Sequence, residues 1–184
     1  MIILGVDPGT LTTGYGVIEM RGSTIRMITC GAVSNDSAML MPIRLKRIFE
    51  TLNTVIAQTH PDECAIETAF YGKNAQSALK LGHARGVAML AAVSRGIPTY
   101  EYSPREIKRS IVGTGTASKQ QVQYMIQSIL HLKELPRKLD TTDALAIAVC
   151  HVHGRLAKRS HGAHKNWKAY LAAHPEKIHS FSRL

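Results

Sequence analysis

Residues 1–19 read MIILGVDPGTLTTGYGVIE, and this stretch contains two apolar runs on either side of a turn. The run over residues 1–6 predicts a short buried strand, which Asp7 ends just before the turn signal Pro8-Gly9. The run over residues 14–19 follows at hairpin distance, and its glycines allow another backbone to approach closely. We therefore expect two paired strands with an acidic residue where the first one ends.

Strand and helix patterns alternate along the rest of the chain. Three early strands joined by tight turns, followed by strands that alternate with helices, predict an α/β fold in which helices cover both faces of a five-stranded mixed sheet. Gly113, Gly115 and Pro136 predict loops near residues 112–117 and 132–140. We expect strands near residues 1–7, 13–20, 24–34, 62–67 and 98–102, and helices near 42–60, 74–95, 104–111, 118–131 and 141–158.

Three more acidic residues lie, like Asp7, where an apolar run meets a turn or a helix start. Glu67 ends the apolar stretch 64–66, and Asp140 and Asp143 open the helical segment ALAIAVCHVHGRLAKR. Positions three apart on a helix share one face, with about 5–6 Å between Cβ atoms. Hard divalent cations prefer carboxylate oxygens, and without a cation such a cluster would repel itself. The four residues predict one metal site built from three chain segments.

Each of these residues also has a purely structural interpretation. An Asp before Pro-Gly is common in turns, Asp140 would suit a helix N-cap, and Asp143 would then lie in the favourable first turn. Glu67 is harder to explain in this way, because an acidic residue after a buried strand lies either at a surface edge or near other buried charge. The combination of all four favours the metal site.

Four stretches of the chain resemble, in the same order, the RuvC family of Holliday-junction resolvases, and the resemblance covers residues 1 to 155. It implies an RNase H-like fold, a homodimer, and Mg²⁺-dependent nicking of four-way DNA junctions at two symmetric positions. The chain departs from the family pattern at Thr68, where Gln is more frequent, and at Thr141-Thr142, but neither departure removes an acidic residue. The stretches are IILGVDPGTLTTGYGVI, AIETAFYGKNAQSALKLGHARGVAMLAA, EYSPREIKRSIVGTGTASKQQV and DTTDALAIAVCH.

The resemblance gives the four acidic residues roles in a two-metal mechanism. Two divalent ions about 3.5–4 Å apart can activate a water, neutralise a phosphate and stabilise the leaving 3′-oxygen. We expect Asp7 to bridge two Mg²⁺ ions, Glu67 to bind one of them with the attacking water, and Asp140 and Asp143 to complete the other. The product would carry a 5′-phosphate, and Mn²⁺ is expected to substitute for Mg²⁺.

Three further residues are expected to contact DNA. Lys108 and Lys119 match basic residues that the family places near the cleaved strand, although each could instead lie on a solvated helix face. Phe70 follows Glu67 by three residues and could wedge between bases at the crossover, where stacking is worth about 1–3 kcal/mol per base. The alternative for a lone Phe is a place in the core.

The helix expected over residues 74–95 is rich in small residues, and its second half, GVAMLAAV, is apolar on nearly every side. Such a helix is commonly just buried in its own fold. An isologous dimer would, however, supply two equivalent active sites for a two-fold junction. The resemblance assigns this helix to the dimer interface, and it also implies the RuvA-RuvB branch-migration complex as a partner.

The charge balance favours a polyanionic partner. The 184 residues include 23 Lys and Arg against 13 Asp and Glu, a net charge of +10. Residues 1–151 contain 16 of the basic and 12 of the acidic side chains, so that the last 33 residues contain 7 basic and 1 acidic. We expect a catalytic domain over residues 1–158 and a basic C-terminal tail over 159–184.

The cysteines and the apolar runs bear on location. Cys30, Cys64 and Cys150 show neither close pairing nor zinc-site spacing, so we expect free thiols in a reducing compartment. No stretch approaches the roughly 18 apolar residues needed to cross a bilayer, and no basic region precedes the first apolar run. We expect a cytoplasmic protein.

Two other classes of function fit part of the pattern. The Asp-Pro-Gly-Thr turn also resembles the phosphate hairpin of actin-like and sugar-kinase ATPases, but those enzymes clamp nucleotide between two such domains and 184 residues suit one. A non-catalytic module that binds junction DNA is the other alternative. Junction cleavage that depends on a divalent ion separates a resolvase from both.

Overall fold

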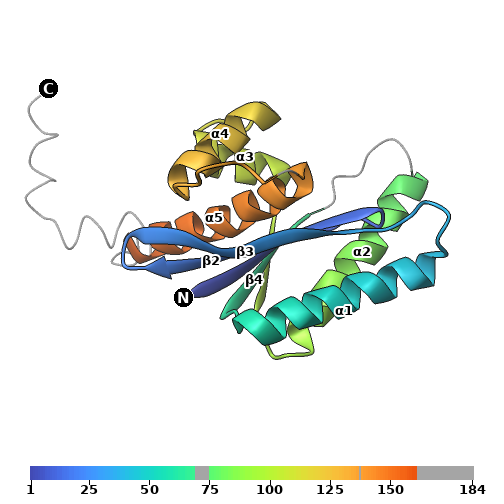
Figure 1. Ribbon diagram of the computed structural model, residues 1–184. Helices are drawn as coiled ribbons and strands as arrows, with labels where there is room; N and C mark the ends of the chain where they lie inside the picture. The colour runs from blue at the N-terminus through green and yellow to red at the C-terminus, as the bar shows by residue number, and fades with distance from the viewer. Residues whose placement is uncertain (69–74, 137, 161–184) are drawn as a thin grey trace, which may run out of the picture. The chain divides into compact units, whose positions relative to one another are not determined.

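The computed structural model describes residues 1–68, 75–136 and 138–160 (Figure 1). The elements follow the predicted order, and the main difference is that the last helix begins at Leu139, so that Asp140 lies in its first turn and is not its N-cap. The strands are β1 (Ile2–Asp7), β2 (Thr12–Arg21), β3 (Thr24–Ser34), β4 (Glu63–Glu67) and β5 (Thr99–Tyr102), and the helices are α1 (Met41–Thr59), α2 (Ala75–Val93), α3 (Pro104–Val112), α4 (Lys119–Ile129) and α5 (Leu139–Ser160).

The five strands form one mixed sheet in the order β3-β2-β1-β4-β5. The first three strands pair antiparallel as a meander, while β4 runs parallel to β1 and β5 runs parallel to β4. This arrangement confirms the expected RNase H-like fold. Contacts group Met1–Val152 into one compact unit, and the chain from His153 onward is assigned separately. The division into a catalytic domain and a basic tail at residue 158 stays a prediction.

The alternation of side chains along the strands produces two separate cores. Leu4 and Val6 of β1 pack with apolar residues of α1 and α2, whereas Ile3 packs with α3, α4 and α5. The helices therefore cover both faces of the sheet, as predicted, with α1 and α2 on one face and the other three on the opposite face (Figure 1). Since successive strand residues point to opposite faces, Asp7 falls on the α5 face with Ile3.

Helix α5 lies unusually close to the sheet because glycines occupy the strand positions beneath it. A Cβ atom added at Gly5 would stand 2.1 Å from the carbonyl oxygen of Ala144, and one at Gly14 would stand 2.0 Å from that of Asp140. At Gly16 the nearest atom would be a side-chain carbon of Leu145, at 2.7 Å. The first turns of α5 can therefore approach β1 and β2 only where the strands lack side chains.

The close contact predicts an unequal response to two similar substitutions. Gly5→Ala forces backbone of α5 away from β1, so we expect a loss in the free energy of unfolding at the upper end of the range of about 1–3 kcal/mol that overpacking costs. Gly16→Ala would meet chiefly the side chain of Leu145, with the backbone nitrogen of that residue farther away at 3.0 Å, and we expect a smaller loss than at Gly5. Urea denaturation measures both. Equal losses would show that α5 is not seated on backbone at Gly5.

Candidate active site

Asp7 and Glu67 end two neighbouring parallel strands. Val6 of β1 pairs with Ile66 of β4, so the residues that follow lie side by side. Both belong to the alternating set that faces α5, and their carboxyl groups share a hydrogen bond. The pairing of the two predicted acids is thus a direct result of strand register.

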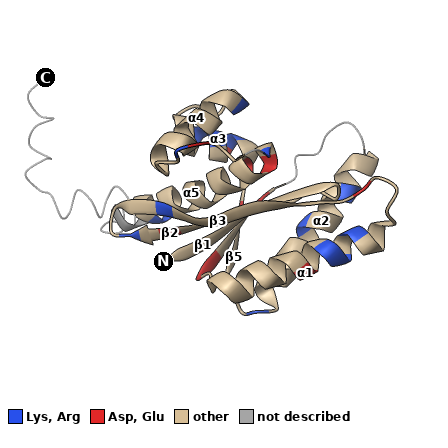
Figure 2. Ribbon diagram, viewed as in Figure 1, with Lys and Arg blue, Asp and Glu red and all other residues tan. Residues whose placement is uncertain are grey.

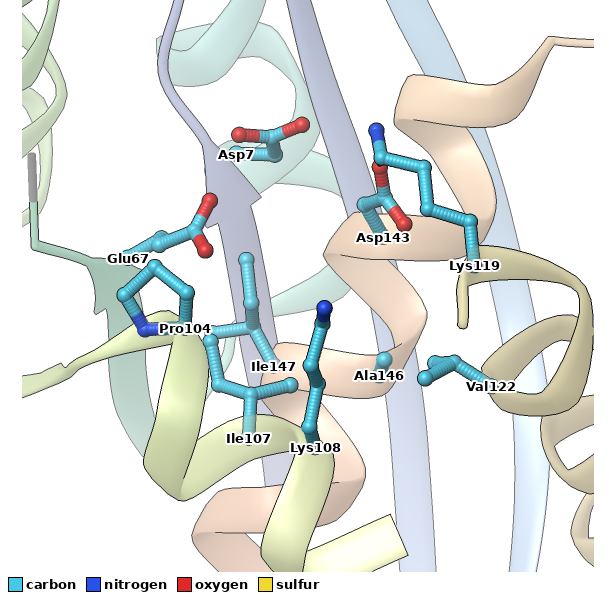
Figure 3. A pocket seen from close by; sticks show the side chains of 10 residues that line it. All are labelled: Asp7, Glu67, Pro104, Ile107, Lys108, Lys119, Val122, Asp143, Ala146 and Ile147. Atoms are coloured by element: carbon cyan, nitrogen blue, oxygen red, sulfur yellow. The ribbon is translucent and has the colours of Figure 1, made fainter. Parts of the chain in front are cut away.

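Helix α5 supplies the other two carboxylates from its first turns. Asp143 points into the same pocket as Asp7 and Glu67, and it accepts a hydrogen bond of 3.2 Å from Nζ of Lys119 (Figure 3). Asp140 packs its backbone on Gly14 and does not line the pocket, although it is near enough for its charge to raise the pKa of Asp7. The structure therefore brings three of the four acids into one pocket and places the fourth beside it.

The electrostatics of the group are unfavourable for several negative charges. Burial is the largest cause that raises the pKa of Asp7, and the nearby charges of Glu67, Asp143 and Asp140 add to it, so that the pKa reaches about 8. Burial also raises the pKa of Glu67, an effect that its hydrogen bond with Asp7 and the charges of Lys119 and Lys108 partly oppose. A bound cation would remove this conflict, because it stabilises the ionised carboxylates.

The donor set fits a hard divalent cation, since all four groups are carboxylates. With the side chains placed as they are over residues 1–68, 75–136 and 138–160, no three His, Cys, Asp or Glu groups are close enough together to hold one ion. The backbone thus delivers the carboxylates to one place, and coordination of a shared ion requires their side chains to turn toward it.

The pocket around these acids has a volume of about 300 Å³, and one of its walls is apolar. Helix α3 contributes part of that wall, and α4 and α5 contribute the rest (Figure 3). The sequence did not single out this wall, because its members look like ordinary core residues of three amphipathic helices. They are Pro104, Ile107, Val122, Ala146 and Ile147.

The two predicted lysines line the pocket from separate helices. Lys108 lies on α3 and Lys119 is the first residue of α4, and both reach the pocket (Figure 3). Each helix begins with a capping box, formed by Ser103 and Glu106 in α3 and by Ser118 and Gln121 in α4. The caps fix where the helices start and hence where the lysines emerge. Asp143 beside Lys119 raises the pKa of that lysine.

Phe70, the predicted wedge, lies outside the described residues, as does the chain after Ser160. Basic residues are found on helices of both faces of the sheet (Figure 2), so net charge does not by itself select the surface that meets a polyanion. One buried polar feature near the pocket escaped sequence analysis, namely a hydrogen-bonded chain that joins Glu63, His151 and Tyr102.

The remaining expectations concern thiols and membranes. Cys64 and Cys150 are buried, Cys30 is partly exposed, and all three are free. None of the helices in the described part of the chain combines enough length and apolar character to cross a lipid bilayer.

Comparisons with known proteins match most of the chain to one family. The family model "Crossover junction endodeoxyribonuclease RuvC" matches residues 3–151. A protein of that name from Cytophaga hutchinsonii is 45% identical over 178 residues, covering 96% of this chain and 88% of the relative. One from Pelobacter propionicus is 51% identical over 153 residues, covering 83% and 86%.

A solved structure extends the likeness to three dimensions. Thermus thermophilus RuvC in complex with a Holliday junction substrate superimposes with a TM-score of 0.80 at 33% identity, covering 84% of this chain and 94% of the other. The match of the family model, the identity to its members and the similarity of the folds all point to one family. The chain therefore belongs to the RuvC family of crossover junction endodeoxyribonucleases.

Proposed function

We propose that this chain nicks Holliday junctions at the pocket where β1, β4 and α5 meet, with Asp7, Glu67, Asp140 and Asp143 as its metal-binding carboxylates. One observation supports the assignment above all others. Carboxylates from three distant segments converge, and their burial and mutual repulsion raise the pKa of Asp7 to about 8, a conflict that a divalent cation relieves. The Thermus thermophilus relative was solved with a Holliday junction, which supports the same substrate here.

Two Mg²⁺ ions, when bound, would neutralise the scissile phosphate and make an attacking water more acidic. Asp7 lines the pocket together with Glu67 and Asp143 and interacts with the charge of both, which supports a role for Asp7 as a ligand shared by the two ions. Glu67 would help to orient the attacking water, while Asp143 and Asp140 would supply ligands from α5. Mn²⁺ shares the preference for oxygen ligands and would substitute. The leaving 3′-oxygen gives a nick with a 5′-phosphate.

Lys108 and Lys119 would hold phosphates of the cleaved strand as point charges. Lys119 is now paired with Asp143, and this pair would open when a cation takes the carboxylate and a phosphate takes the ammonium group. Phe70 would insert at the crossover. In sequence it comes two residues after Thr68, whose backbone N–H donates a hydrogen bond of 2.8 Å to the carbonyl oxygen of Tyr102.

We propose that α2 forms the interface of a homodimer. Four of its small residues, Ala84, Ala88, Ala91 and Ala92, are buried within the chain's own fold. The opposite side presents an exposed stripe of apolar and small residues at helical spacing, with Leu79 63% and Leu90 57% exposed and open space above the glycines between them. The stripe consists of Leu79, Gly82, Gly86, Leu90 and Val93.

Two further proposals extend beyond the described residues or beyond this chain. The basic segment over residues 159–184 would bind DNA phosphates and strengthen binding at low salt. A dimer with two equivalent active sites would act on junctions delivered by the RuvA-RuvB complex. We place both activities in the cytoplasm.

The carboxylate assignment predicts loss of cleavage without loss of binding. Removing a residue that only hydrogen-bonds a metal ligand lowers metal affinity or activity by about 10–100-fold, and removing a ligand itself should cost at least as much. We therefore expect nicking to slow by at least about 100-fold in each of four variants, Asp7→Asn, Glu67→Gln, Asp140→Asn and Asp143→Asn. Binding of a labelled synthetic junction should persist, since the lysines remain. Asp36→Asn, in an exposed turn, serves as the control. Near-normal nicking by the Asp7 variant would contradict the assignment.

The raised pKa of Asp7 predicts how stability depends on pH without metal. The folded state keeps a proton on Asp7 up to about pH 8, whereas the unfolded state releases it near pH 4, so stability falls as pH rises between these values. In EDTA at pH 8, Asp7→Asn should therefore be more stable than the wild type by at least about 1 kcal/mol, and the difference should shrink toward pH 4.

Thermal melts across this pH range, with and without Mg²⁺, measure the effect. Adding Mg²⁺ should raise the melting temperature of the wild type and leave that of Asp7→Asn almost unchanged. If the difference in stability between the two proteins is the same at every pH, the pKa of Asp7 is not raised in the folded state.

The wedge proposal predicts that Phe70→Ala slows cleavage of intact junctions much more than it weakens binding, because the ring acts when the crossover opens. Fluorescence of 2-aminopurine next to the crossover reports that opening directly, and it should not rise when the variant binds. If the variant instead loses the roughly 3–5 kcal/mol of a core truncation and keeps its activity per folded molecule, Phe70 is a core residue.

A further inference from the structure

A chain of buried hydrogen bonds joins α5 to β4 and β5 through residues that do not themselves line the pocket. Nε2 of His151 on α5 lies 2.5 Å from Oε2 of Glu63 on β4, and its Nδ1 lies 2.7 Å from the hydroxyl of Tyr102 on β5. His151 is fully buried and Glu63 is only 8% exposed. When both nitrogens of a buried imidazole are hydrogen-bonded, the ring can keep both bonds in only one orientation and one position.

His151 belongs to the stripe of α5 that faces the sheet. Asp140, Ala144 and Ala148 recur at intervals of four residues, and His151 follows three residues later, which is the spacing of one helix face. Asp140 rests on Gly14 of β2, and the two alanines rest on β1. The stripe therefore crosses the sheet from the acidic end of the helix to the histidine.

The contacts along this stripe differ in how well they fix the helix. Alanine against Gly5 is a flat contact that has no protruding side chain to prevent sliding along the axis. The bonds of His151 are directional, and a shift of the helix would strand a carboxylate and an imidazole in the core, which is costly. His151 is thus the contact best suited to set the axial position of α5.

Both partners of His151 lie on strands that position Glu67. Glu63 is four residues before Glu67 on β4, on the same face of the sheet, and Tyr102 is the residue that pairs with Glu67 across β4 and β5. Burial raises the pKa of Tyr102 to about 12, so it remains a neutral hydroxyl. The ring of Tyr100, with its centroid 4.7 Å from that of His151, packs on the imidazole.

We propose that His151 is a positioning residue, whose bonds to Glu63 and Tyr102 hold α5 at the place along the sheet where Asp140 and Asp143 meet Asp7 and Glu67. The inference rests on the proposed role of these four carboxylates as metal ligands. It predicts that removing the bonds weakens binding of the divalent ion, while the DNA-binding surface stays intact.

The test compares His151→Leu with Val152→Ala in the full chain. Both change buried side chains of α5, but only the first removes the polar anchor. Calorimetric titration with Mn²⁺ in the absence of DNA should show about tenfold weaker binding for His151→Leu, and kcat on a saturating junction should fall about tenfold with KM nearly unchanged. Val152→Ala should lower the melting temperature and leave both values as in the wild type.

Conservative and paired variants keep the test decisive. Glu63→Gln retains an acceptor for the imidazole and should keep most of the wild-type affinity for Mn²⁺. Glu63→Met should lose as much affinity as His151→Leu. The double variant that combines Glu63→Met with His151→Leu should bind Mn²⁺ no more weakly than either single variant. The double variant leaves no unmatched charge in the core and replaces His151→Leu if that protein fails to fold. Tyr102→Phe, which removes one hydroxyl, should show a smaller loss of the same kind.

The possible outcomes separate this inference from the proposed function. If His151→Leu and the double variant bind Mn²⁺ and turn over as well as the wild type per folded molecule, His151 has only a structural role and the inference is overturned. If Asp7→Asn binds Mn²⁺ as well as the wild type does, the metal site itself is wrongly assigned. Weaker Mn²⁺ binding in both variants, with Val152→Ala unaffected, supports both.

Discussion

The close approach of α5 to the sheet is the constraint on which the rest of the structure depends. Asp140 and Asp143 are about 130 residues away from Asp7 in sequence, and they meet it only because the helix rests on strands whose side chains are missing at Gly5 and Gly14. Larger residues there would lift the helix and separate the carboxylates. Glycine in a central strand lowers the stability of that strand, but at Gly5 and Gly14 it also lets α5 bring its carboxylates to the site.

The assembled site works against the stability of the metal-free fold. Burial deprives these carboxylates of solvent and they repel one another, and the two effects together raise the pKa of Asp7, so that it retains a proton. Lys119 offsets part of the charge through Asp143. A divalent ion would replace the proton and the lysine together, which would free the ammonium group for a phosphate. The unfavourable burial and repulsion of the carboxylates in the metal-free protein would therefore be relieved when metal and substrate bind, which favours binding.

Much of the fold and most of the site could be predicted from the sequence, because the strongest signals are local. The apolar run before Asp7 and the one before Glu67 each mark a strand end, and strand alternation then places both acids on one face. The start of α5 at Leu139 was misplaced by two residues, since Asp140 suits a helix N-cap as well as a first turn. Prediction assigned no role to Glu63 and His151, because their meaning depends on contact between residues 88 positions apart.

Both backbone contacts and side-chain bonds hold the four acidic residues in place before an ion binds. Glycine contacts and strand register fix the Cα positions of the four acids, and His151 adds a directional bond where flat contacts cannot resist sliding. In the part of the chain that the structure describes, no three of the carboxylate side chains are close enough together to bind one ion. Rotation of a few side chains is a small motion compared with moving a helix, so the site can close on an ion without repacking the core. A nuclease that must cut only a correctly bound junction gains from this order, because the last step of assembly can wait for the phosphate.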